Sequence, residues 1–314
     1  MNPAERLVIV NPHAGGGKAG DRWARLAPRL QVLFPHVAVV TDDAEEARLA
    51  AVAAGEAGVK VLVAAGGDGA VHALLNAIMD PLTDRPRWDV ALGAVGLGSS
   101  NDFHKPADPA RRVGGASVAM DPDAGRRLDV GRADWVTPGG DPHVAYFLLN
   151  SSMGATAVGN LRYNHPEGVQ AVLKDLHPDL AIHWGTLEAI ARFENLPARL
   201  ELDDEAPIEA AIGNLGVIKR VHFAGGMRYD TPVTPDDGRF DVNWCDGMDR
   251  FEFVKAVMAI SHGRFLGLPK CHHRRAERVR VVPAAPTALE LDGEVHVASE
   301  VTLRVVPKAL WVCG

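Results

Sequence analysis

The chain has 314 residues, of which 47% are hydrophobic, and its formal net charge is -7 at pH 7. This length allows a large buried core and favours two domains over one. The negative charge gives no overall field toward nucleic acid or anionic lipid, so we expect no nucleic-acid partner and only local membrane contact.

Features of targeting and redox chemistry are weak in this sequence. No run of about 18 apolar residues is present, and the polar start MNPAERLVIVN lacks the pattern of a signal peptide. The cysteines, Cys245, Cys271 and Cys313, are far apart and show no CxxC spacing. We therefore expect free thiols in a cytoplasmic protein, peripheral at the inner membrane face if it meets lipid.

The first predicted strand, Leu7–Val10, is followed by a glycine-rich segment over 13–18. The P-loop pattern fails there, because Pro12 stands where its first glycine would be and Ala19 where its Ser or Thr would be. Asn11 can still donate a side-chain amide to a ligand at the end of the strand. A flexible surface loop is the alternative for this segment.

Strands and helices alternate over the next part of the chain. Val37–Thr41 reads as a second strand, Ala44–Ala57 as a helix and Val59–Ala65 as a third strand. This alternation predicts a doubly wound, parallel α/β sheet that binds ligands at the carboxyl ends of its strands. Thr41 and Asn11 both lie at that edge.

Residues 61–78 read as a buried strand, a tight glycine turn and an amphipathic helix. Gly66, Gly67 and Gly69 would allow positive φ angles and the close approach of a phosphate to the N-terminus of the helix. Asp68 beside a phosphate requires a cation or a transferable proton between them, which predicts a nucleotide site with a metal or general base. The alternative is a structural turn in which Asp68 caps the helix.

A fourth strand, Val90–Val95, precedes a loop that extends through Phe103. Its small, hydroxyl and amide groups would form a second side of the phosphate site, although a plain Gly/Ser turn is the alternative. After Leu128–Gly131 the pattern changes to short strands bounded by turns, which predicts an antiparallel sandwich or barrel. These strands are expected at 143–150, 198–203, 209–213, 240–244, 279–282, 289–291 and 301–306, with helices at 167–193 and 249–260.

Charged segments of the second half suggest further sites. Three carboxylates between Thr231 and Asp241 surround a glycine turn, which is typical of a site for a hard cation. An ordinary Asp-Gly turn is the alternative. Asp292 and Glu294 would share one face of a strand, but Gly293 permits a turn that separates them. The basic segment 270–280 is either a solvated face or a patch for phospholipid headgroups.

Several of these stretches together resemble one family, the soluble lipid kinases with a diacylglycerol kinase catalytic domain, which include sphingosine kinases and phosphatidylglycerol-kinase-like proteins. The family signature GGDGT is similar to Gly66–Ala70, and PLGTGNDFA is similar to Gly96–His104. The family motifs NPxSG, LDLG, DGxxD and DGE are similar to Asn11–Gly15, Leu128–Gly131, Asp237–Asp241 and Asp292–Glu294. Their order and spacing extend the resemblance over nearly the whole chain.

The resemblance implies two domains with the site in the cleft between them. The first is a Rossmann-like, NAD kinase-related α/β domain over residues 1–134, to which residues 307–314 return. The second is an antiparallel β-sandwich with helices over residues 135–306, which binds the lipid. The residues implied to bind ATP are Asn11, Thr41, Gly66, Gly67, Asp68, Gly69, Ser99, Asn101 and Glu294.

The resemblance also implies the chemistry. Asp292 would be the general base for a lipid hydroxyl, and Asp68 would act through Mg2+ or share that role. Asp237, with the carbonyls of Thr234 and Arg239, would match the structural magnesium site of the family. The expected protein is an ATP- and Mg2+-dependent kinase for a diacylglycerol-like or related lipid at the membrane surface, with a homodimer as one candidate assembly.

Two departures from the family pattern leave other functions open. Ala70 replaces the signature threonine, and Ser99–Ser100 replace Thr-Gly. A lost hydrogen bond to an anionic ligand costs about 1.5 to 3 kcal/mol, which would weaken ATP binding without abolishing it. An NAD kinase-like enzyme and a catalytically silent nucleotide- or lipid-binding homologue are the alternatives.

Overall fold

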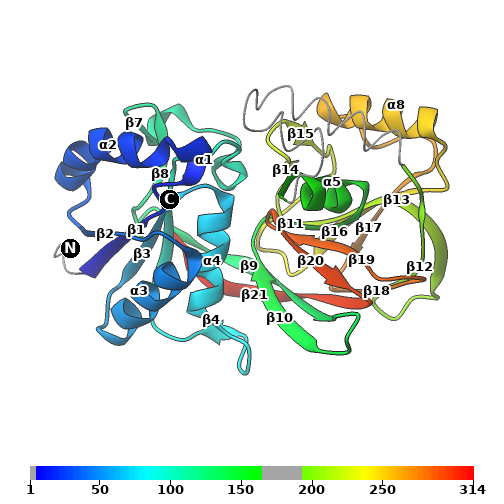
Figure 1. Cartoon of the computed structure of the whole chain (residues 1–314), viewed down its shortest axis with the longest axis horizontal. Coiled ribbons are helices and arrows are strands. Elements are labelled where there is room, and N and C mark those ends of the chain that lie inside the picture. Colours follow the sequence, from blue (N-terminus) through cyan, green and yellow to red (C-terminus); the bar gives the residue numbers. More distant parts are fainter. Residues whose placement is uncertain (1–4, 165–192) are drawn as a thin grey trace.

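The computed structural model of the protein describes residues 5–164 and 193–314. Two domains lie beside each other, with the N-terminal third of the chain in one and most later strands in the other (Figure 1). The helix predicted over 167–193 lies, except for Phe193, outside the described residues. In the part of the chain that the structure describes, no helix combines the length and apolar character needed to span a bilayer.

Parallel strands form the sheet of the first domain, in the spatial order β2, β1, β3, β6. They are β1 (Arg6–Val10), β2 (Val37–Val40), β3 (Val61–Gly66) and β6 (Ala91–Gly96). The helices of this domain are α1 (Ala14–Gly17), α2 (Ala19–Leu33), α3 (Ala44–Glu56) and α4 (Asp68–Ile78). Shorter strands are β4 (Met79–Asp80), β5 (Arg85–Pro86), β7 (Arg112–Val113) and β8 (Ala116–Ala119), and one-turn helices are η2 (Asp102–His104) and η3 (Pro109–Arg111).

The residues of β1 alternate between two cores. Leu7 and Ile9 pack in a cluster with the apolar faces of α3 and α4. Val8 and Val10 pack in another cluster with Trp23 of α2. Because successive side chains of a strand point to opposite faces, a strand that is apolar throughout is buried between helices on both sides. The predicted doubly wound sheet is therefore confirmed.

Antiparallel strands form the β-sandwich of the second domain around one core, which includes Leu200, Leu215, Val242 and Leu289. They are β10 (Pro142–Phe147), β11 (Asn150–Gly154), β12 (Leu196–Leu202), β13 (Ile208–Ile218), β16 (Phe240–Asp246), β17 (Cys271–Ala276), β18 (Arg278–Pro283), β19 (Thr287–Leu291) and β20 (Glu294–Ala298). The remaining elements are α5 (Ala155–Asn164), α8 (Arg250–Ser261) and the hairpin β14 (His222–Phe223) and β15 (Met227–Arg228).

Two long strands cross between the domains. They are β9 (Arg126–Val136) and β21 (Glu300–Val312), which pair antiparallel along most of their lengths (Figure 1). Leu128 of β9 packs in the first core, whereas Trp135 packs in the second. Near its end β21 also pairs parallel with β6, at Trp311 opposite Ala91. The proposed boundary at residue 134 thus falls inside a continuous strand.

The basic segment near residue 270 is a strand, which the sequence did not predict. Residues Cys271–Ala276 form β17 and pair with β16. His273 hydrogen-bonds Asp241 at 2.7 Å, and His272 stacks on Trp244. His272 and His273 therefore pack within the sandwich, and the segment is not only a solvated basic face.

Candidate functional site

The glycine turn lies between β3 and α4, at the carboxyl edge of the parallel sheet. None of Gly66, Gly67 and Gly69 has a positive φ, so the expectation of left-handed backbone there is wrong. Their small size is needed for close approach instead. A Cβ at Gly69 would lie 2.9 Å from Oε1 of Glu294, and a Cβ at Gly67 would lie 3.3 Å from Cα of Gly98.

Asp68 joins the glycine turn to the loop after β6. Its carboxylate accepts hydrogen bonds from the backbone N–H groups of Asp102 (3.0 Å) and Phe103 (2.9 Å). It makes no capping hydrogen bond to its own helix, which excludes the alternative of a simple N-cap. The loop is braced by Asn101, whose amide exchanges two hydrogen bonds with the backbone of Gly98.

Burial raises the pKa of Asp68 above its ordinary value. The two backbone hydrogen bonds oppose this shift, and the nearby carboxylates of Asp102 and Asp292 add to it. A group whose charge is disfavoured in this way gains from a bound cation. The charge of Asp292 in the second domain thus acts on Asp68 in the first.

Asp292 lies in the two-residue turn between β19 and β20. It has φ 50°, and Gly293 has φ 97°, as expected for the Asp-Gly turn of a tight hairpin. Its carboxylate accepts hydrogen bonds from the backbone N–H groups of Leu148 (2.8 Å), Leu149 (2.8 Å) and Asn150 (3.1 Å). The turn sends Asp292 inward and Glu294 toward the glycine turn, so the two acids are separated.

His72 is a site residue that the sequence reasoning missed. Nδ1 of His72 lies 3.6 Å from Oδ2 of Asp292, and both residues are buried. The Asn76 carbonyl oxygen accepts from the Tyr146 N–H, which directs the Asn76 amide group at Nε2 of His72. Nε2 is thus in contact with Asn76, whereas Nδ1 is buried beside Asp292 without a hydrogen-bond partner among the described residues. The spacing of four residues from Asp68 on one helix could have indicated His72.

Glu290 lies behind Asp292 and was also missed. It accepts hydrogen bonds from Ser152 Oγ (2.5 Å), Asn150 Nδ2 (3.1 Å) and the Gly293 N–H (2.5 Å). Burial raises the pKa of Glu290 to about 7. An acid between two leucines of a predicted strand could have indicated Glu290 as a buried site residue.

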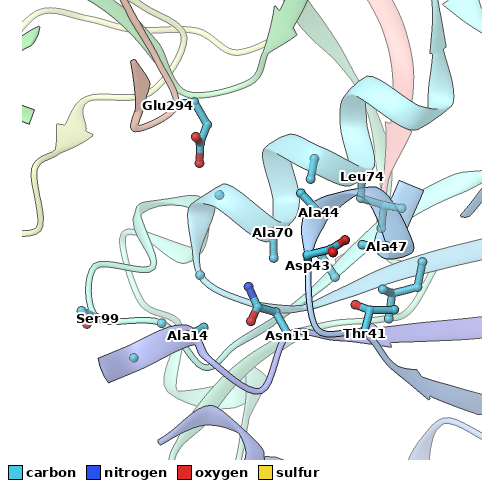
Figure 2. A pocket seen from close by; sticks show the side chains of 17 residues that line it. Asn11, Ala14, Thr41, Asp43, Ala44, Ala47, Ala70, Leu74, Ser99 and Glu294 are labelled. Atoms are coloured by element: carbon cyan, nitrogen blue, oxygen red, sulfur yellow. The ribbon is translucent and has the colours of Figure 1, made fainter. Parts of the chain in front are cut away.

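A cavity of about 330 Å³ opens at this edge of the sheet. Six of the residues implied to bind ATP line it: Asn11, Thr41, Gly67, Gly69, Ser99 and Glu294. The other three, Gly66, Asp68 and Asn101, are not among its lining residues, and neither is the implied general base Asp292. In Figure 2, Glu294 points into the cavity from the side opposite Asn11.

The cavity has a polar end and an apolar end. Asn11 Oδ1 accepts from the His13 N–H at 3.0 Å, so its amide NH2 is free to donate into the cavity (Figure 2). Ala44, Ala47 and Leu74 line the other end, where Asp43 adds one carboxylate (Figure 2). Anionic groups fit the first end and a planar, weakly polar group fits the second.

The three predicted metal ligands do come together, but a lysine ammonium lies among them. Lys219 Nζ is 2.9 Å from the Thr234 carbonyl, 2.6 Å from the Arg239 carbonyl and 3.2 Å from Asp237 Oδ1. The cation position of this turn is thus filled by a side chain of the protein, and these residues do not fit a divalent metal as they stand. The sequence reasoning missed Lys219, although a lysine directly after the apolar residues 215–218 was a visible signal.

Family models match most of the chain. Residues 5–133 match the diacylglycerol kinase catalytic domain, and residues 167–314 match the YegS C-terminal NAD kinase beta sandwich-like domain. The chain is 24% identical over 297 residues to the diacylglycerol kinase of Staphylococcus saprophyticus, and this match covers 91% of this chain and 88% of that protein. It is also 24% identical over 290 residues to the diacylglycerol kinase of Bacillus subtilis, with the same coverage of 91% and 88%.

Solved structures share the fold. A diacylglycerol kinase from Bacillus anthracis superposes with a TM-score of 0.65 at 18% identity, over 98% of this chain and 96% of that chain. A second crystal structure from that organism gives a TM-score of 0.71 at 20% identity, with coverage of 98% and 96%. Both domains and their arrangement are thus found in these structures.

Proposed function

Because the chain belongs to the family of soluble lipid kinases with a diacylglycerol kinase catalytic domain, we propose that it transfers the γ-phosphoryl group of ATP to a lipid hydroxyl. One observation carries this proposal. The glycine turn of the first domain and the acidic hairpin of the second meet at a single cavity, where Glu294 lies against Gly69.

The nucleotide would lie with its phosphates at the polar end of the cavity. The first N–H groups of α4 lack partners within the helix and favour an anion at this point. The free amide of Asn11 and the hydroxyl of Ser99 add donors at the cavity wall. The nucleoside would occupy the apolar end between Thr41 and Leu74.

Asp292 would accept the proton of the attacking hydroxyl. Its three backbone hydrogen bonds fix the carboxylate in one orientation, which is what a positioned general base requires. The imidazole of His72, whose Nδ1 lies 3.6 Å from Oδ2, packs beside the carboxylate and limits its movement. Asp68 would hold the Mg2+ that accompanies ATP, and this ion neutralises phosphate charge when it is bound.

The experiment is an assay with γ-labelled ATP against a total lipid extract in detergent micelles and, in parallel, against NAD. We expect label in an extracted lipid, which mass analysis would identify. Label in NAD alone would support the NAD kinase-like alternative. Saturable ATP binding without transfer to any acceptor would support a silent homologue, to which the missing threonine hydroxyl at Ala70 would contribute.

A further inference from the structure

The oxygen atoms around Lys219 form a closed cage. Asp129 Oδ2 lies 2.8 Å from Lys219 Nζ, in addition to the carbonyls of Thr234 and Arg239 and the carboxylate of Asp237. The exposed fraction of the side chain is 1% for Lys219 and 0% for Asp129. An ammonium can be buried this deeply only where oxygen atoms replace its water shell, as they do here.

The charges within the cage balance without a metal ion. Asp129 and Asp237 carry two negative charges, and Asp237 is paired with Arg275 as well as with Lys219. Two cations thus face two carboxylates. A divalent ion added beside Lys219 would leave an excess of two positive charges in a buried site, and one that displaced the ammonium would leave it buried and unpaired.

The distances also suit an ammonium. The contacts of Lys219 Nζ with its acceptors range from 2.6 Å (Arg239 O) to 3.2 Å (Asp237 Oδ1), as in N–H···O hydrogen bonds. Magnesium requires oxygen ligands at about 2.0–2.1 Å in near-octahedral geometry. The cage is therefore arranged around a nitrogen.

We propose that Lys219 is an internal replacement for the divalent cation, so that this protein needs no metal to join its two domains. The cage connects both crossing strands to the turn before β16. Asp129 lies on β9, and its carboxylate also accepts the backbone N–H groups of Gly238 (2.7 Å) and of Lys308 on β21 (2.8 Å). Removal of the ammonium would leave Asp129 buried where these strands meet.

The same lysine is linked to the catalytic edge through the backbone. The Lys219 N–H donates to the Leu149 carbonyl at 2.8 Å, and the Leu149 N–H donates to Asp292 Oδ1 at 2.8 Å. The backbone at residue 219 thus supports the segment that holds Asp292, whatever side chain stands there. The inference itself concerns stability and metal content and does not depend on the reaction proposed above.

The test compares thermal unfolding and metal content of the full chain without nucleotide. We expect the Tm of the wild type to be the same in EDTA and in millimolar Mg2+, and dialysed protein to contain no stoichiometric metal. Lys219→Met, which keeps the apolar stem, should lower Tm by on the order of 10 °C because it leaves buried carboxylates unpaired. The matched control Lys60→Met removes an exposed lysine and should leave Tm unchanged.

Three outcomes would overturn the inference. The first is a wild-type Tm that Mg2+ raises, with the rise abolished in Asp237→Asn. The second is a bound divalent ion that is lost in Asp237→Asn. The third is a Lys219→Met protein as stable as the wild type. Should the lysine variant fail to fold, the wild-type and Asp237→Asn measurements decide the question alone.

Discussion

His72 links the two halves of the site at the scale of a single residue. It lies on α4 of the first domain, and its Nδ1 faces Asp292 of the second at 3.6 Å. Asn76 fixes the ring by occupying Nε2. A histidine in this position supports the orientation of the base without contacting the phosphates.

We expect His72→Ala to lower kcat by about tenfold, because the buried imidazole packs beside Asp292 and its loss would let the carboxylate move from its position. The KM for ATP should change little, since His72 does not line the cavity. Steady-state kinetics with saturating lipid measures both. His72→Gln keeps a polar side chain that fills much of the same space and should recover part of the rate.

His13→Ala is the matched control, because His13 is exposed and outside the site. An unchanged kcat in His72→Ala, with KM also unchanged, would show that His72 has no positioning role.

Motifs predicted some site residues and could not predict others. Asp68 and Asp292 stand in short, recognisable glycine turns, so the sequence alone singled them out. Lys219 directly follows the apolar strand β13, and Glu290 lies within β19; the partners that define their roles are far along the chain. No local pattern specifies such partners.

The hairpin of β19 and β20 brings three acids to the site. Glu290 comes from β19, Asp292 from the turn and Glu294 from β20. Its Asp-Gly turn could be read from the sequence, but β20 and β17 were not predicted as strands. Both carry charged or polar residues at positions that alternate irregularly, so their pairing partners decide their structure. Buried apolar strands such as β1 and β3 were predicted because burial fixes their composition, whereas β2 was predicted from its valines although it is exposed.

We expect Glu290 to make the stability of this hairpin depend on pH. Burial raises its pKa from 4.5 to about 7 in the folded protein, so the folded state binds the proton more tightly than the unfolded chain. The resulting stabilisation is fully present below the unfolded pKa and is lost as pH rises through about 7. In Glu290→Gln this dependence should disappear.

The measurement is Tm as a function of pH for both proteins, from about pH 5 to about pH 8. The Tm of Glu290→Gln relative to the wild type should rise with pH over this range. His104 has the opposite effect, because burial lowers its pKa to about 4, but it is present in both proteins and cancels in the difference. A difference that is independent of pH would contradict the assignment.

At the scale of the whole molecule, the site exists only where the two domains meet. The crossing strands β9 and β21 and the cage around Lys219 set the position of one domain relative to the other. Alternating strands and helices, followed by a run of strands, predicted the two kinds of domain. The resemblance implied their common cleft, whereas the contacts that close it, such as Glu294 on Gly69, required the structure.

The central claim is that the nucleotide held by the first domain reacts through Asp292 of the second. The most direct measurement compares Asp292→Asn with the wild type in ATP binding by calorimetry and in single-turnover phosphoryl transfer to the lipid acceptor. Tm is recorded as well, because Asn would lose an acceptor for one of the backbone N–H groups at residues 148–150.

We predict an ATP affinity within a few fold of the wild type, because Asp292 does not line the cavity. The transfer rate should fall by about 10²- to 10⁴-fold, as for the loss of a general base. A folded Asp292→Asn protein that binds ATP and transfers phosphate at close to the wild-type rate would contradict the account.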